Sequence, residues 1–311
     1  MSSIIKRIEA YLFESSNFMN KRVAVILLML SCIFYLLMIF PDINILFHEI
    51  YQDTATISGN KFINLLIPEL VEVKYLFEVV GFPVRLVTPI LTSLYMLAVM
   101  LVIIDVKPLM FSVIAMLIHM VFSFSTYLHS FGVDTYISFA LFINLMIQLS
   151  RLKIKSFSII YPYTIRFAQI QLCIIYFFAG IGKAVGVDWI DGNAMWLVST
   201  IYMGQVGEWL AKLMIAFPVL SIMLSWSILA LEIFYPLLIH TKRLRVITLT
   251  GVIAMHISIA LFMSLYSFGV VMIVLNLVGF GHYYRPIWDK LKAKLLPFLS
   301  AQQRALYPSD G

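Results

Sequence analysis

The sequence predicts an all-α, polytopic membrane protein, a transmembrane helix bundle, from its composition and from the order of its apolar and basic residues. Of the 311 residues, 62% are hydrophobic and only 12% are charged, and the mean hydropathy is +0.96. Soluble domains are about 45–50% apolar and about 25% charged. The apolar residues are gathered into runs that are each about one membrane span long, and basic residues flank those runs.

Eight apolar runs have the length and composition of membrane-spanning helices. A span needs about 20 mainly apolar residues, and the fourth and eighth runs are short for this, so we expect tilt or extension by a flanking turn. The runs cover residues 23–40, 86–105, 109–127, 135–150, 163–182, 218–239, 246–264 and 266–281.

The basic residues predict the orientation of the bundle. If the N-terminus is cytoplasmic, eight spans leave few cations on the outer side, and all other Lys and Arg residues lie inside, as insertion topology favours. The outer cations would be Lys61, Lys74, Arg85, Lys183 and Lys212. Both termini are then cytoplasmic. The pI near 9.2 reflects this bias, so membrane lipid is an expected partner and nucleic acid is not.

Three regions follow from this pattern. Residues 1–22 would form a cytoplasmic amphipathic segment on the membrane surface, residues 23–282 the transmembrane bundle, and residues 283–311 a basic amphipathic tail attracted to anionic lipid. On the outer side, segments 41–85 and 183–217 both contain helical patterns. We expect these two segments to fold together as a cap over the outer mouth of the bundle.

The sequence indicates neither a disulfide nor a metal site. Cys32 and Cys173 both fall inside apolar spans, where a cysteine is usually a small buried hydrophobe. There is no Cys-x-x-Cys motif and no Cys/His cluster, so no metal site is expected.

Three ionisable residues inside the spans are candidates for function, because such groups are expensive in lipid and usually face the bundle interior. His119 and His256 both lie roughly 12 Å below the outer boundary, counted at the helical rise. By the same count of residues, Glu232 lies nearer the inner side, and Pro236 would kink the helix around it. Each has a plain alternative: a histidine that bonds a neighbouring helix, or a carboxyl that fixes packing.

Lys183 has two opposed interpretations. It follows a long apolar helix that we expect to end at a flexible pair, Gly180 and Gly182, where membrane meets water. An interfacial lysine commonly extends to the headgroups as an anchor. If its amine instead faces inward beneath a cap, desolvation favours the neutral amine, which can act as a base.

The segment around Lys183 resembles a known family signature. The family is the vitamin K-dependent gamma-carboxylase-like membrane family, also called the horizontally transferred transmembrane (HTTM) domain family. The matching residues are Gln171, Tyr176, Phe177, Ala179, Gly180, Lys183, Asp188, Trp189 and Gly192. Glu232 and His256 match, in order, an acidic residue of the next span and an intramembrane histidine.

The resemblance implies a bacterial inner (plasma) membrane protein with an outward-facing cavity. Lys183 would be the catalytic base, supported by His256 and Glu232, in quinone-linked or peptide-modifying chemistry with a reduced quinone. Residues Tyr176, Gln171, Asp188, Trp189 and His119 would line or border the cavity. In size the chain is similar to bacterial single-domain members, one of which matures a sporulation-delaying peptide toxin.

Two other functions stay open at this stage. The chain would be a non-enzymatic membrane partner in the maturation, export or immunity of a secreted antimicrobial peptide if Lys183 tolerates replacement. It would be a haem or quinone redox protein if His119 and His256 share a cofactor.

Overall fold

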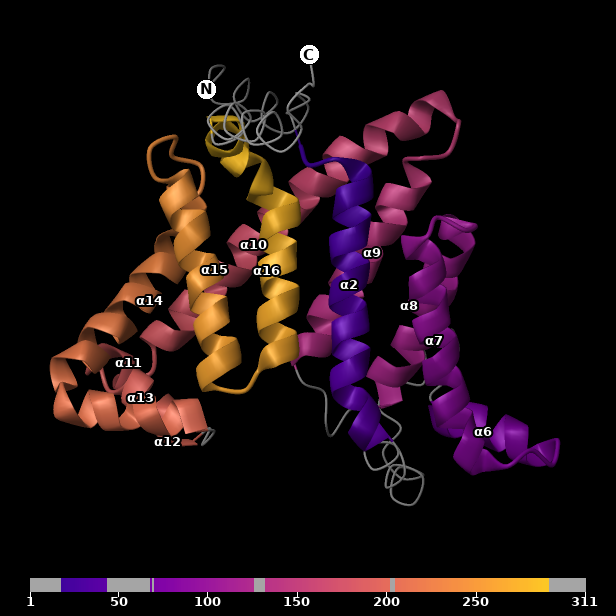
Figure 1. The fold of residues 1–311 in the computed structure, drawn as a ribbon, viewed down its shortest axis with the longest axis horizontal. Coiled ribbons are helices and arrows are strands. Elements are labelled where there is room, and N and C mark those ends of the chain that lie inside the picture. Colours follow the sequence, from indigo (N-terminus) through magenta and orange to yellow (C-terminus); the bar gives the residue numbers. More distant parts are fainter. Residues whose placement is uncertain (1–17, 44–67, 69, 126–131, 202–204, 291–311) are drawn as a thin grey trace, which may run out of the picture.

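The computed structural model is helical throughout the residues that it describes, which are 18–43, 68, 70–125, 132–201 and 205–290 (Figure 1). Eight helices within these ranges are long and apolar enough to cross a membrane. The prediction of an all-α, multi-pass membrane protein is therefore confirmed. Helices suit this setting because they satisfy every backbone hydrogen bond internally, which lipid cannot do for them.

The spanning helices agree with the predicted runs to within a few residues at most ends. Their bounds are α2 (Lys21–Ile39), α7 (Val87–Ile103), α8 (Pro108–Ser125), α9 (Gly132–Leu149), α10 (Ile160–Ala184), α14 (Pro218–Leu238), α15 (Arg245–Phe262) and α16 (Tyr266–Phe280). The two short runs are extended as expected. The fourth begins at Gly132, and the eighth continues into the 3-10 helix η5 (Gly281–Tyr284). Two other 3-10 helices, η3 (Val84–Leu86) and η4 (Lys155–Ile159), precede α7 and α10, and η1 (Phe40–Asp42) follows α2.

The bundle has a central group with a helix pair on either side. The central helices α2, α9, α10 and α16 pack on one another. On one side, α7 packs against α2 and α8, and α8 against α9. On the other side, α14 packs against α10, and α15 against α14 and α16. Figure 1 shows these two flanking pairs at opposite edges of the molecule.

Short helices cover one end of the α10/α14/α15 side. Helices α11 (Val187–Ile190), α12 (Ala194–Ile201) and α13 (Gln205–Ala216) join α10 to α14, and all three pack on α14. We call this end of the bundle the cap end. The opposite end carries the loops 104–107, 150–154 and 239–244, and we call it the basic end (Figure 1).

The expectation of one joint cap is wrong for the part of segment 41–85 that the structure describes. Helix α6 (Leu70–Val79) packs against α8, α7 and η3, whereas α13 packs against α14 and α15. The two lie at opposite edges of the molecule in Figure 1. Residues 44–67, together with the surface segments expected within 1–17 and 291–311, lie outside the described residues.

Polar contacts hold the loops of the basic end. Arg151 donates to both carboxylate oxygens of Asp105, at 2.7 Å from Nη1 and 2.6 Å from Nη2. Arg22 donates to the backbone carbonyls of Val102 and Ile103 at the end of α7. A cation at a helix C-terminus is favourable because the last carbonyls are otherwise unpaired.

Replacing Asp105 with asparagine should weaken folding at neutral pH and have a smaller effect in acid. The hydrogen bonds from Arg151 hold the pKa of Asp105 below its ordinary value of 3.8. A lowered folded-state pKa stabilises the protein above the unfolded pKa, and this stabilisation is lost as pH falls through the folded value. Because the pair is partly exposed, we expect a loss of less than about 1 kcal/mol that shrinks in high salt.

Thermal unfolding of wild-type and Asp105→Asn protein at pH 7 and pH 3 tests this. Asparagine tolerates the positive φ of +68° at this position, so backbone strain does not confuse the result. The exposed Asp289→Asn variant serves as control. If Asp105→Asn lowered the thermal stability by the same amount at both pH values, the stabilising ion pair between Asp105 and Arg151 would be contradicted.

Candidate functional site

A cavity of about 540 Å³ lies between α10, α14, α15 and α16, beneath α11–α13. Its walls are mainly aliphatic and aromatic side chains, with a small number of polar groups. Pockets for small molecules commonly have this size and this mixture. The polar residues that carry its chemistry are Lys183, Glu232, His256 and Tyr176.

Lys183 and Glu232 form an ion pair in the wall of this cavity. Lys183 Nζ lies 2.9 Å from Oε1 and 2.6 Å from Oε2 of Glu232. The Glu232 side chain is 6% exposed and that of Lys183 is 29% exposed. The Lys183 Nζ also lies 5.5 Å from the centre of the Trp189 ring, within range of a cation–π contact. The amine therefore faces inward and does not extend toward the headgroups.

Gly180 is the residue that lets α10 and α14 come close enough for this pair. A Cβ atom built there would lie 2.7 Å from Cγ1 and 2.8 Å from the backbone N of Ile233, closer than real Cβ contacts. Gly182 has open space around its Cα. Because Lys183 is one turn beyond Gly180, the helix crossing at Gly180 brings the lysine to Glu232.

A hydrogen-bonded chain of four side chains supports the other polar wall. Tyr235 Oη donates to Asn276 Oδ1 at 2.8 Å, and Asn276 Nδ2 donates to Tyr176 Oη at 2.7 Å. Tyr176 Oη lies 2.7 Å from His256 Nε2. These residues come from α14, α16, α10 and α15, so the chain joins all four spanning helices of the cavity.

The chain of bonds also determines the proton positions on His256. Asn276 Nδ2 donates to the carbonyl of Met272 at 2.8 Å, which fixes that amide atom as nitrogen. Tyr176 Oη thus accepts from Asn276, and its own proton goes to Nε2 of His256. The remaining proton of a neutral His256 is then on Nδ1, which is buried and has no partner within the described residues. His256 is 2% exposed and lines the cavity.

The cap closes the cavity by means of a second tight approach. Gly192 has a φ of +79°, and a Cβ there would lie 2.7 Å from Cα of Ile222 on α14. Ser221 on α14 donates to the Gly192 carbonyl at 2.7 Å. Trp189, Met195, Val198, Ser199 and Leu210 reach the cavity from this cap. The helical pattern predicted within segment 183–217 is confirmed by α13.

The structure separates the predicted site residues into two groups. Lys183, Glu232, His256, Tyr176 and Trp189 all line one cavity. Gln171, Asp188 and His119 are not among its lining residues, and Asp188 is exposed.

His119 belongs to the other side of the bundle. Its Nε2 lies 3.1 Å from the carbonyl of Asp134 and 3.0 Å from the hydroxyl of Ser138, so it joins α8 to α9. The structure thus does not bring His119 and His256 together. Within the described part of the chain, no group of three or more His, Cys, Asp and Glu side chains is arranged to hold a metal ion.

One local expectation was wrong. Helix α10 continues to Ala184, so Gly180 and Gly182 lie inside a helix and do not end it. Glu232, which was counted nearer the inner side, is in direct contact with Lys183.

Sequence reasoning missed the support that Asn276 and Tyr235 give to the site. Intramembrane amides such as Asn276 commonly only join helices. Asn276 does so, but the group that it bonds is the tyrosine that fixes His256. In the sequence, the only indication of this role was an amide side chain within the last span. Residue spacing could not show that its partner is Tyr176.

Comparison with known proteins adds no assignment. No family model, no curated protein and no solved structure matches this chain. The fold itself defines the class, which is a multi-pass helical membrane protein with an intramembrane polar site.

Proposed function

We propose that this chain is a bacterial inner-membrane protein of the gamma-carboxylase-like family. In this proposal the cavity binds a reduced quinone and Lys183 acts as a base on its hydroxyl. The observation that carries the proposal is the Lys183–Glu232 pair in the wall of a mainly apolar cavity. An anchoring lysine would need neither the buried carboxylate nor the cavity.

The pair has the geometry to supply a neutral amine. A proton that moves from Nζ to the carboxylate oxygen 2.6 Å away leaves an amine and a carboxylic acid. Two charges held away from water are costly, so a ligand that excludes water favours this neutral form. The amine can then take a proton from a substrate hydroxyl, and Glu232 holds the proton that Lys183 gave up. A positioned base of this kind contributes about 10²–10⁴-fold to a rate.

The opposite wall suits a ring that carries oxygen atoms. His256 lines this wall, and its buried Nδ1 makes no hydrogen bond to the described protein residues. The Phe268 ring lies 5.5 Å from the His256 ring, and the surrounding wall is apolar. A flat aromatic headgroup with two oxygens matches this arrangement.

Retention of quinone by the purified protein tests the proposal. Ser227 is exposed in the cavity wall, so a Ser227→Trp variant fills the cavity with little disturbance of packing. Ser93 is an exposed serine of α7 that does not line the cavity, so Ser93→Trp is the matched control. We expect mass spectrometry to find quinone in wild type and Ser93→Trp, and at least about tenfold less in Ser227→Trp. Wild-type protein without quinone, or equal amounts in all three proteins, would contradict the proposal.

A further inference from the structure

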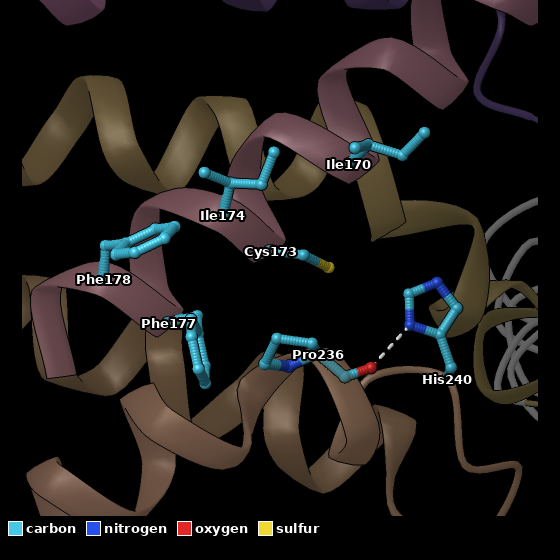
Figure 2. Close-up of a pocket in the computed structure, with 7 residues that line it drawn as sticks. All are labelled: Ile170, Cys173, Ile174, Phe177, Phe178, Pro236 and His240. Carbon is cyan, nitrogen blue, oxygen red and sulfur yellow. Dashed lines mark hydrogen bonds between the residues drawn. The ribbon is translucent and has the colours of Figure 1, made fainter. Parts of the chain in front are cut away.

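A groove on the outside of the bundle lies between α10 and α14, apart from the cavity (Figure 2). Its volume is about 500 Å³, and its lining residues are Ile170, Cys173, Ile174, Phe177, Phe178, Pro236 and His240. All but His240 are apolar or weakly polar, and Phe178 is 65% exposed. The groove faces the region that lipid would fill around a spanning helix.

The groove and the cavity use opposite faces of α10. Ile170, Cys173, Ile174 and Phe177 recur at i, i+3, i+4 and i+7, which places them on one stripe of the helix. Tyr176, Ala179 and Lys183 form the stripe that faces the cavity. A molecule in the groove is therefore separated from the site by the helix itself.

Local sequence explains why there is a hollow here. Cys173 is small beside the larger residues around it, and Figure 2 shows its sulfur directed into the space between α10 and α14. Pro236 presents its ring to the same space and has no N–H with which to continue the helix bonding. The result is an apolar slot between the two helices.

The end of the groove toward the basic end is polar and positively charged. His240 is held there by a 2.8 Å hydrogen bond from its Nδ1 to the carbonyl of Pro236 (Figure 2). The loop that follows carries the exposed cations Lys242 and Arg243. The sequence has no Asp or Glu between Glu232 and Asp289, so nothing acidic along that stretch offsets these charges.

We propose that the groove binds an anionic phospholipid, with one acyl chain between α10 and α14 and the phosphate against Lys242 and Arg243. The apolar slot alone would accept the chain of any phospholipid. The cations supply the selectivity, because each Lys or Arg near the membrane surface favours anionic lipid by about fivefold. Two of them predict a preference for phosphatidylglycerol over phosphatidylcholine on the order of 10- to 30-fold.

The native thiol in the groove offers a direct test. Cys173 is partly exposed in the groove, whereas Cys32, the other of the two cysteines in the chain, is fully buried. In detergent, N-ethylmaleimide should alkylate Cys173, and phosphatidylglycerol should slow the reaction at roughly a tenth of the mole fraction that phosphatidylcholine requires. The Lys242→Ala/Arg243→Ala variant should lose this difference, and Lys153→Ala/Lys155→Ala, altered in another exposed basic loop, should keep it.

A second measurement does not depend on thiol reactivity. Native mass spectrometry should show one fewer retained phosphatidylglycerol in Cys173→Trp, which fills the slot, and an unchanged number in Cys173→Ser. Equal protection by both lipids in wild type, a preference that survives the Lys242→Ala/Arg243→Ala change, or equal retention by the two Cys173 variants would each overturn the proposal.

Discussion

Replacing Lys183 with alanine is expected to lower quinol oxidation by dissolved oxygen, which follows deprotonation of the quinol, by about 10²–10⁴-fold, the contribution of a positioned general base. The variant removes the amine that would take the hydroxyl proton and leaves Glu232 without its cation. The measurement uses protein in liposomes, menadiol as the reduced-quinone probe, and an oxygen electrode. Oxidation of the probe in protein-free liposomes sets the background.

The matched control for this prediction is Lys212→Ala. Lys212 is also a cap-end lysine in an ion pair, at 2.6 Å from Glu208, but its side chain is 72% exposed. Its loss should leave the rate unchanged. Because Lys183→Ala leaves a buried carboxylate, the Lys183→Met/Glu232→Gln double variant is measured beside it, as a folded protein that lacks the base. Full activity in a folded Lys183 variant would exclude the catalytic role and favour the non-enzymatic peptide partner.

Replacing Gly180 with alanine should destabilise the protein by about 1–3 kcal/mol, the usual effect of overpacking a tight contact. The added methyl group would meet Ile233 at 2.7–2.8 Å, including a backbone atom that cannot move alone. Separation of α10 and α14 would also draw Lys183 away from Glu232, so activity should fall with stability. Unfolding in mixed micelles, followed by tryptophan fluorescence, gives the free energy of unfolding.

Gly182→Ala is the internal control for the Gly180 prediction. Gly182 is exposed, with nothing within 4 Å of the new Cβ, and it is in the same turn of α10. Alanine favours a helix over glycine by about 1 kcal/mol, so this variant should be as stable as wild type or more stable. Similar losses in both variants would mean that the Gly180 contact does not limit the approach of α10 to α14.

The spans were predictable from the sequence because the property that defines them is local. A run such as 218–239 is apolar enough to identify by itself, and α14 covers Pro218–Leu238. The same holds for run 163–182, although α10 continues beyond it to Ala184. The fourth span was identified despite its length, although Asp134 lies in the first turn of α9 and shortens its apolar run.

The site was predictable only as a collection of residues. Glu232 and His256 were selected because ionisable groups are expensive in lipid, and Lys183 because of its place beyond an apolar helix; all three line the cavity. Which of them touch was not readable, because contact depends on the crossing at Gly180 and on helix tilt. His119 satisfied the same criterion as His256, yet it bonds α9 on the other side of the bundle. The type of residue determines how costly it is to bury an ionisable side chain. The rotation of its helix and the neighbouring helices determine which residue it contacts.

The prediction of a joint cap was wrong for a related reason. Helices α6 and α13 lie at the same end of the bundle (Figure 1), but the position of each at that end depends on which spans it connects. Helix α6 is followed by α7 and stays beside α7 and α8, whereas α11–α13 join α10 to α14. Chain connectivity therefore held them at opposite edges of the bundle.

The most direct test of the central claim is a double-mutant cycle between Lys183 and Glu232. Lys183→Met alone should cost about 3–5 kcal/mol of unfolding free energy, because it leaves a buried carboxylate unpaired. Glu232→Gln alone should cost less, since Lys183 is partly exposed and can turn toward water. The double variant should regain much of the loss, which gives a coupling of about 1–3 kcal/mol. Additive effects, with coupling near zero, would show that the two side chains are not paired and would contradict the account of the site.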